Sequence, residues 1–224
     1  MTTPMNDRTK RDLIEEYRAA FDRLPQEAAE LGLRLTVKTV QALSRGRPIA
    51  RTELVDLWGM PSGAVNDVLE ASVTAGQAEV DPEGRLVGGV LTLDPTDHQI
   101  TFGDRTVFAW CSFDALWAPA VVGETARVRS TDPVTGGTID LTVSPSGVED
   151  VRPAEAVVTV VGADAAADGG RDSPRCTHML FFESRASALE WTDEVPGVAI
   201  LTPAEAREIA EASVVDRARS IGLV

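Results

Sequence analysis

Cys111, Asp114 and Cys176 are the residues of this 224-residue chain whose types and spacing could carry chemistry. Cys111 and Cys176 are its two cysteines, and Asp114 follows Cys111 three positions later. If that segment is helical, positions i and i+3 share one face, so the thiol and the carboxylate meet. A thiol beside a carboxylate, with a second thiol folded against it, can bind a soft metal and hold a proton.

The sequence around Cys111 favours a reactive thiol. A helix that begins near Cys111 would place its positive end at the sulfur and favour the thiolate. Asp114 would raise the proton affinity of both groups, so the pair could hold and deliver one proton. Four flanking aromatic side chains are expected to exclude water and to admit an apolar organic group: Phe108, Trp110, Phe113 and Trp117.

Each cysteine taken alone is more often a small buried hydrophobe. Cys176 precedes an apolar run, Thr177 to Phe182, that is predicted as a core strand. On that run His178 is interpreted as a structural histidine, and His98 has no partner at metal-ligand spacing. Zinc is not predicted, because two cysteines without a CxxC or HxxxH pattern do not build a closed tetrahedral site.

Composition and charge limit the class of protein. The chain is 43% hydrophobic and 25% charged, and its formal charge of −14 disfavours binding to nucleic acid or to anionic membranes. Residues 31–60 alone are locally basic, with five Arg and Lys against two acidic residues. No apolar run is long enough to span a bilayer and no signal peptide is recognisable, so we expect a cytoplasmic protein with reduced thiols.

Residues 1–95 are predicted to form a winged-helix-like helical module with an N-terminal extension. A hairpin of residues 78–80 and a strand at 86–93, joined by a turn at 81–84, would be the wing. The recognition helix would lie near residues 61–75, but it has no Lys or Arg, so the module is interpreted as a scaffold. Helices are predicted over 7–24, capped by Asn6 or Asp7, and over about 33–43, 51–57 and 61–75.

Residues 96–224 are predicted to form a β-rich catalytic domain that carries both cysteines. Residues 111–122 are one apolar segment, and residues 163–174 are predicted as a mobile surface loop. The fold class is therefore α+β, with a mixed or antiparallel sheet and flanking helices after the helical module. Strands are expected over 99–102, 125–129, 138–143, 156–161 and 177–182, and helices over 187–191 and 203–220.

Two motifs give the chain a family resemblance. These are Phe-Ala-Trp-Cys-x-x-Asp at Phe108–Asp114 and Cys-Thr-His at Cys176–His178, followed by Phe181-Phe182. With them, the chain resembles the organomercurial lyases, also called alkylmercury lyases, from about residue 30 to residue 205. Further segments that share the resemblance are 45–52, 119–123, 125–128, 141–146 and 151–154.

The resemblance implies cleavage of a carbon–mercury bond by protonolysis, to a hydrocarbon and Hg(II), with no cofactor consumed. It implies that Cys111 and Cys176 are the mercury ligands, and that Asp114 relays or donates the proton and then helps to hold the metal. Hg(II) would leave to cellular thiols or to a mercuric reductase. The resemblance leaves open whether the protein is a monomer or a homodimer.

The chain departs from the family pattern at two positions. Many members have a further cysteine where this chain has Asp132, and some have one where this chain has Thr177. These losses bear on auxiliary metal handling or fold stability more than on activity. Residues 1 to about 20 resemble an added helix that bears on substrate access or association.

Two other functional classes stay open at this point. A winged-helix mercury sensor or binding protein would bind the metal without turnover, and it would not need Asp114 as a proton donor. A thiol redox protein would instead use Cys111 and Cys176 as a reversible disulfide.

Overall fold

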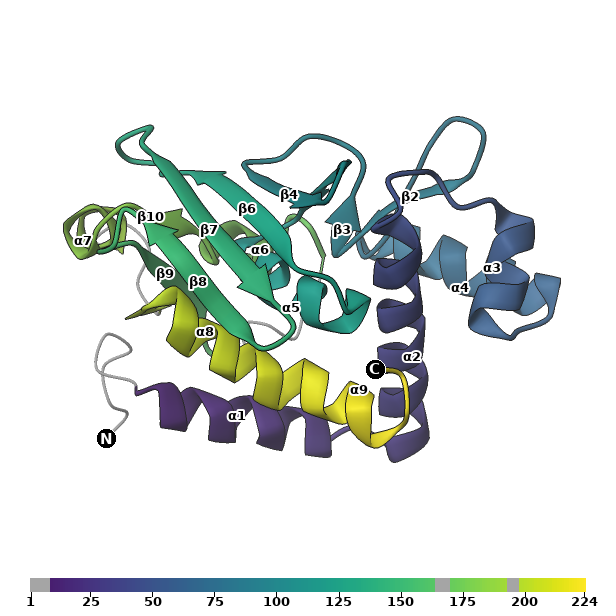
Figure 1. Cartoon of the computed structure of the whole chain (residues 1–224). Helices are drawn as coiled ribbons and strands as arrows, with labels where there is room; N and C mark the ends of the chain where they lie inside the picture. Colours follow the sequence, from purple (N-terminus) through teal and green to yellow (C-terminus); the bar gives the residue numbers. More distant parts are fainter. Residues whose placement is uncertain (1–8, 164–169, 193–197) are drawn as a thin grey trace.

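The computed structural model describes residues 9–163, 170–192 and 198–224 (Figure 1). Within these ranges the larger sheet is antiparallel, with the strand order β1-β2-β3-β5-β4-β6-β7-β8. A smaller antiparallel sheet has the order β10-β9-β11. The α+β class with a large antiparallel sheet is thereby confirmed. The strands are β1 (Glu79–Val80), β2 (Leu86–Gly89), β3 (Leu91–Thr92), β4 (His98–Phe102), β5 (Arg105–Ala109), β6 (Ala126–Thr131), β7 (Thr138–Ser144), β8 (Gly147–Arg152), β9 (Val157–Val161), β10 (Phe181–Phe182) and β11 (Val198–Leu201).

The N-terminal helices follow the predicted order with shifted ends. The predicted caps Asn6 and Asp7 lie outside the described residues, and Thr9 caps the first helix in a reciprocal capping box with Asp12. The second helix begins seven positions earlier than predicted, directly after Pro25. The helices are α1 (Lys10–Asp22), α2 (Gln26–Leu43), α3 (Arg51–Trp58) and α4 (Ser62–Thr74).

The predicted strand at residues 86–93 is wrong as a single element. Val90 has a φ of 74°, in the left-handed region, and Gly89 pairs with Leu91 across it. The chain therefore reverses at Val90 into two short strands, and β3 continues the sheet by pairing with β5. The predicted domain boundary between residues 95 and 96 lies between β3 and β4 and stays a prediction.

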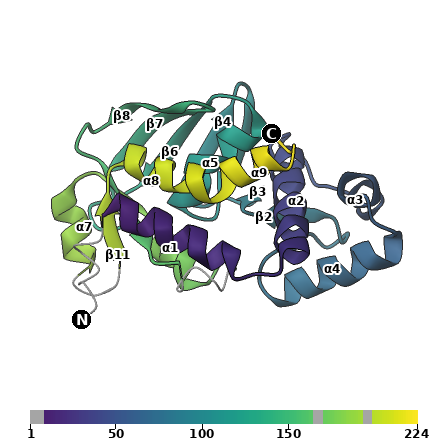
Figure 2. The same cartoon turned by 90° about the horizontal axis from the view of Figure 1, so that it is seen from below.

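The buried face of the larger sheet packs on a central helix, α5 (Ser112–Val122). Residues alternate between buried and exposed along β6, as expected for a strand with one face on the core. In α5 every residue from Ser112 to Val121 is buried, which is typical of a helix inside a core. Figure 2 shows α5 between the sheet and the C-terminal helices α8 (Pro203–Ala210) and α9 (Asp216–Ser220).

The predicted strand at residues 177–182 is also wrong over most of its length. Pro174 occupies the first turn of a short helix, α6 (Pro174–His178), and proline at this position favours a helix start. Only Phe181 and Phe182 form a strand. Cys176 therefore lies on a helix, and His178 ends that helix.

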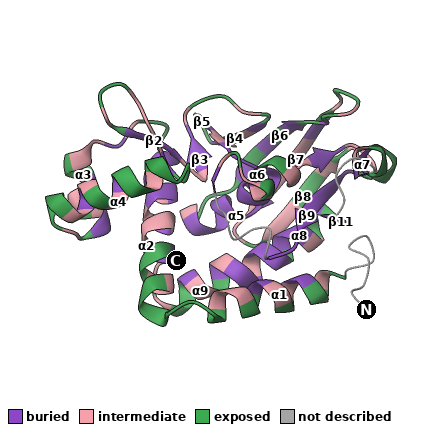
Figure 3. Ribbon diagram, turned by 180° about the vertical axis from the view of Figure 1, so that it is seen from behind, coloured by how far each residue is buried: buried purple, intermediate pink, exposed green. Residues whose placement is uncertain are grey.

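The C-terminal segment forms the predicted helix with one irregularity. Residues 211–215 make a π-helical turn between α8 and α9, and α1 runs beside this helix (Figure 1). The predicted helix near Trp191 is α7 (Arg185–Thr192). Figure 3 shows exposed outer faces on α3 and α4. Residues 164–169 of the predicted mobile loop lie outside the described residues. No helix in the described part of the chain is long and apolar enough to cross a membrane.

His98 gives the fold a pH dependence that can be measured. Burial lowers the pKa of His98 from 6.5 to about 4, and Nδ1 lies 2.8 Å from the Ser130 hydroxyl. The unfolded chain therefore binds a proton below pH 6.5 that the folded chain takes up only near pH 4. We expect the free energy of unfolding to fall by about 3 kcal/mol as the pH is lowered from 6.5 to about 4. Urea unfolding of wild type and His98→Gln at pH 7 and pH 4.5 checks this, and equal pH dependence in both would contradict it.

Candidate active site

A backbone contact joins the segments that carry Cys111 and Cys176. Cys111 is the residue before α5, at the end of the segment that leaves β5. The Ser112 N–H donates to the Met179 carbonyl at 3.0 Å, which ties the start of α5 to the residue after α6. This pairing places the two thiols side by side, although they are far apart in sequence.

Cys111, Asp114 and Cys176 form one buried cluster. One ligand atom from each lies within 4.8 Å of the other two, and both thiols are free. Cys111 is fully buried, Asp114 is 2% exposed and Cys176 is 5% exposed. The three residues singled out by type and spacing therefore meet in the structure. Two sulfurs and a carboxylate at this separation can hold a single soft metal ion.

Asp114 is held by two neighbours and by its own burial. Trp117 Nε1 donates to Asp114 Oδ1 at 3.2 Å, and Arg175 Nη2 lies 3.7 Å from the same oxygen. Burial raises the pKa of Asp114 above its usual value, while Arg175 and hydrogen bonds from Cys111 and Trp117 oppose the rise. The net rise in pKa favours a carboxyl group that can take up a proton inside the protein.

The expectation that the helix start would favour a Cys111 thiolate is wrong. Burial raises the pKa of Cys111 well above its usual value, and the hydrogen bond with Cys176 and the charge of Asp114 raise it further. Arg175 lowers the pKa of Cys111, but by less than burial and the other two effects raise it. Removal from water therefore outweighs the helix end, and Cys111 is a thiol until a partner accepts its proton.

Arg175 is a site residue that sequence reasoning missed. Its side chain is 25% exposed, and its Nε is buried with no hydrogen-bond partner among the described residues. It is the cation that opposes the pKa rise at both Asp114 and Cys111. Its position next to Cys176 in sequence was the available signal, but only the α6 helix turns it toward Asp114.

A cleft of about 340 Å³ opens onto the cluster, with Asp114, Arg175 and Cys176 in its wall. Two of the four predicted aromatic residues, Trp110 and Trp117, line it. Phe113 instead packs on Tyr17, with ring centroids 5.9 Å apart, and Phe108 lies in β5 opposite Gln99.

The end of the first helix and the residues after it border the same cleft. Phe21 and Leu24, at and after the end of α1, form part of its wall, and Tyr17 of α1 reaches the core near Cys111. The added helix thus contributes directly to the surroundings of the cluster.

Glu79 braces the two halves of the site. Its Oε1 accepts a hydrogen bond from Arg171 Nη1 at 2.6 Å, and its Oε2 accepts from Thr92 Oγ1 at 2.9 Å and from Trp110 Nε1 at 3.4 Å. Trp110 precedes Cys111, and Arg171 lies in the segment that leads into α6. One carboxylate of the N-terminal region therefore connects the two cysteine-bearing segments.

Glu79→Gln is expected to lower kcat/KM about tenfold, because loss of the charge loosens the segment before Cys176 and small misplacements at a reacting centre are costly. Steady-state kinetics with an organomercurial, the substrate class that the family resemblance implies, measure this. Glu53→Gln is the matched control, since Glu53 pairs with exposed Arg47 in the same region. Equal kinetics for both variants and wild type would show that the brace does not position the thiols.

His178, Thr177 and Asp132 make contacts that stabilise the fold. His178 contacts Trp191 edge-on, and the Thr177 hydroxyl donates to the Ser173 carbonyl at 3.0 Å. Asp132 is buried and accepts hydrogen bonds from the Ser187 hydroxyl and from the Glu183 N–H. Burial alone would raise the pKa of Asp132, but these bonds and two further backbone N–H groups hold it below its usual value. Asp132 therefore organises a turn.

Comparisons with known proteins point to one family, and each match covers more than half of the chain. The sequence model of the family described as "Alkylmercury lyase" matches residues 91–214. The alkylmercury lyase of Pseudomonas putida is 37% identical over 177 residues, which cover 79% of each chain. That of Staphylococcus epidermidis is 34% identical over 170 residues, 76% of each chain. The chain belongs to the alkylmercury lyase family. The resemblance inferred from its motifs is confirmed.

A solved structure shows the same fold. The structure titled "Crystal structure of the mercury-bound form of MerB2" aligns with a TM-score of 0.71 at 23% identity, over 89% of this chain and 96% of that one. The family's cysteine motif thus lies, in this chain, at a helix start that faces a second thiol and an arginine. This placement is the basis for assigning chemistry to individual residues.

Proposed function

We propose that this chain cleaves the carbon–mercury bond of organomercurials by protonolysis, releasing a hydrocarbon and Hg(II). The observation that carries the proposal is the buried cluster of two free thiols and one carboxyl group, within 4.8 Å of one another, at a cleft with apolar walls. Membership of the alkylmercury lyase family supports it.

The first steps load mercury onto the thiols. Cys176 lines the cleft, so it meets the mercury of R–Hg–X first and displaces X, and its proton leaves with X. Cys111 then gives its proton to Asp114 and bonds to mercury through sulfur. Asp114 begins this step as a carboxylate, and its raised pKa makes it a better proton acceptor. The bond from the Cys111 sulfur to mercury offsets the raised pKa of that thiol.

The last step breaks the carbon–mercury bond. The proton on Asp114 passes to carbon, the electron pair of the C–Hg bond becomes the new C–H bond, and R–H leaves. Hg(II) stays on the two sulfurs beside the Asp114 carboxylate. Arg175 stabilises that carboxylate, because a guanidinium stays protonated at any relevant pH.

This chemistry requires an acceptor for Hg(II) but no cofactor. No cofactor is consumed, since both electrons of the new bond come from the C–Hg bond. Small thiols are needed to remove Hg(II) from Cys111 and Cys176. Cellular thiols or a mercuric reductase are the proposed acceptors, in the cytoplasm, and the protein acts as a monomer or homodimer without nucleic acid or membrane.

We also propose that the N-terminal region is a winged-helix module. The helices α3 and α4 and the β1–β2 hairpin have the order that such a module requires. α4 contains Asp67 and Glu70 and no Lys or Arg, which disfavours DNA binding and therefore the sensor alternative. We interpret the module as a scaffold that supplies Glu79 and part of the cleft wall.

Turnover of phenylmercury with excess small thiol tests the function. We expect benzene in a multiple of the enzyme concentration, detected by gas chromatography, and Hg(II) on the added thiol. Tight binding of phenylmercury and of methylmercury without benzene or methane would assign the chain to the sensor or scavenger class. Reversible loss of both thiols on mild oxidation, with no hydrocarbon formed, would favour the redox class.

A further inference from the structure

The proton donor determines on which side of the cluster the organic group of a bound substrate lies. Asp114 and Cys176 line the 340 Å³ cleft, whereas Cys111 is fully buried and is not part of its wall. Under the proposed function, on which this inference rests, the carbon that receives the proton must lie beside Asp114. The organic group therefore occupies this cleft.

A second cleft reaches Cys176 from another direction but does not suit a hydrocarbon. It has a volume of about 530 Å³, and Asp114 is not in its wall. Polar and charged side chains dominate its lining, including Thr96, Asp97, Arg171 and Asp172. An apolar group placed there would lie in a cleft that Asp114 does not line, and it would desolvate charges.

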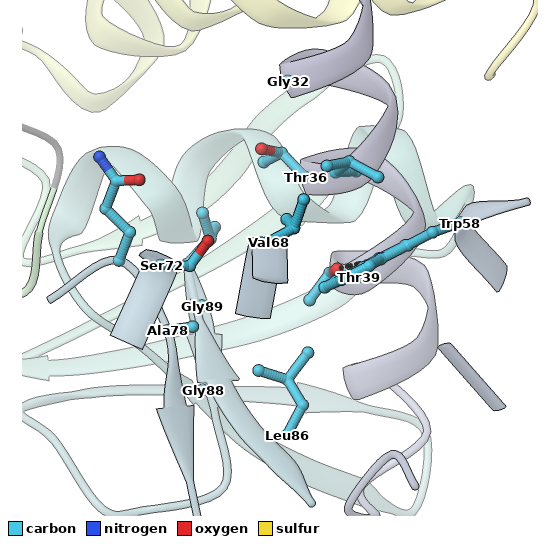
Figure 4. A pocket seen from close by; sticks show the side chains of 13 residues that line it. Gly32, Thr36, Thr39, Trp58, Val68, Ser72, Ala78, Leu86, Gly88 and Gly89 are labelled. Atoms are coloured by element: carbon cyan, nitrogen blue, oxygen red, sulfur yellow. Dashed lines mark hydrogen bonds between the residues drawn. The ribbon is translucent and has the colours of Figure 1, made fainter. Parts of the chain in front are cut away.

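The cleft beside Asp114 adjoins a further cavity. This cavity, of about 230 Å³, lies between α2, α4 and the β1–β2 hairpin (Figure 4). Four residues line both spaces: Gly32, Thr36, Gln77 and Val90. Gly32 and Thr36 are one turn apart on α2, so one face of this helix runs from one space to the other, and Gln77 and Val90 complete the shared wall.

The walls of this cavity suit a hydrocarbon. Leu35, Val68 and Leu86 contribute apolar side chains, and Gly88 and Gly89 leave the adjoining strand without side chains. The Trp58 N–H in the wall is already satisfied by the Thr39 hydroxyl at 3.1 Å. An apolar group that enters therefore leaves that indole donor paired and removes hydrophobic surface from water.

We propose that this cavity, which we call the outer subsite, receives the far end of larger organic groups, such as aryl and longer alkyl chains, during carbon–mercury cleavage. The methyl group of methylmercury ends beside Asp114 and does not reach it. Burial of each additional methylene in the outer subsite is expected to raise kcat/KM by up to about fourfold. The outer subsite therefore sets a preference for n-butylmercury over methylmercury.

The test is the ratio of kcat/KM for n-butylmercury to that for methylmercury in four proteins. Gly32→Leu adds a side chain at the shared wall, where a Cβ meets nothing within 4 Å, and Val68→Phe fills the outer subsite alone. Gly63→Leu is the matched control, because Gly63 is also a helical glycine with open space and lies outside both cavities. We expect the ratio to fall at least about fivefold in both test variants and to keep the wild-type value in the control.

The possible outcomes test the outer subsite and the proposed function independently. Cleavage of both substrates with one ratio in all four proteins would overturn the outer subsite and leave the proposed function intact. Absence of hydrocarbon from every protein would overturn both. If Gly32→Leu does not fold, as judged by circular dichroism, Val68→Phe decides the question by the same ratio.

Discussion

Replacing either Cys111 or Cys176 with alanine is expected to lower turnover of phenylmercury by at least about a thousandfold, a loss of roughly 4 kcal/mol of transition-state stabilisation. In the proposed mechanism, both sulfurs bond to mercury before the carbon carries enough negative charge to accept a proton. One thiol alone can hold the substrate but cannot complete the chelate. Benzene release measured by gas chromatography gives the rates.

We also expect each cysteine variant to hold Hg(II) less tightly than the wild type. Wild type is expected to bind one Hg(II) per two thiols, because Cys111 and Cys176 lie close enough to share one ion. Each alanine variant, with one thiol left, is expected to lose Hg(II) to a small dithiol that does not strip the wild type rapidly. Circular dichroism serves as the folding control. A variant that folds and still turns over at the wild-type rate would remove that cysteine from the mechanism.

Asp114→Asn is expected to keep substrate binding and to lose cleavage by about a thousandfold, within the range of a general acid–base group. The amide oxygen can still accept the hydrogen bond from Trp117, but the side chain can neither take the proton of Cys111 nor give one to carbon. Single-turnover experiments with phenylmercury therefore should show bound mercurial and no benzene.

Asp114→Glu is the matched comparison for this substitution. It keeps the acid, so partial activity is expected where Asp114→Asn has none, reduced because the longer side chain must fit a site that is 2% exposed. Equal activity of Asp114→Asn and wild type would show that the proton reaches carbon from another group.

The local part of the site could be predicted from sequence, and the tertiary part could not. The spacing of Cys111 and Asp114 predicted that the thiol and the carboxylate meet at a helix start, and they do, with Cys111 as the residue before α5. No spacing rule places Cys176 beside them, and the pairing came from the family motifs. The helix at Cys176 was missed because the apolar run that ends in Phe182 favours a strand, whereas Pro174 starts a helix before it.

Other misses have physical reasons of the same kind. β8 was not predicted, because most of its residues are at least partly exposed and it shows no alternation. β2 and β3 were predicted as one strand because the positive φ of Val90 is not visible in an apolar sequence. The brace at Glu79 depends on the pairing of β3 with β5, which places Thr92 opposite Phe108, two residues before Trp110. Such roles follow from strand register across distant segments.

Single turnover of phenylmercury in D₂O, without added thiol, tests the central claim most directly. The protons on Cys111, Asp114 and Cys176 exchange with solvent, so protonolysis predicts benzene that carries one deuterium, at one benzene per Hg(II) retained by the protein. Mass spectrometry of the released gas gives this number. Bound phenylmercury with no benzene from the folded protein, or benzene without deuterium, would contradict the account.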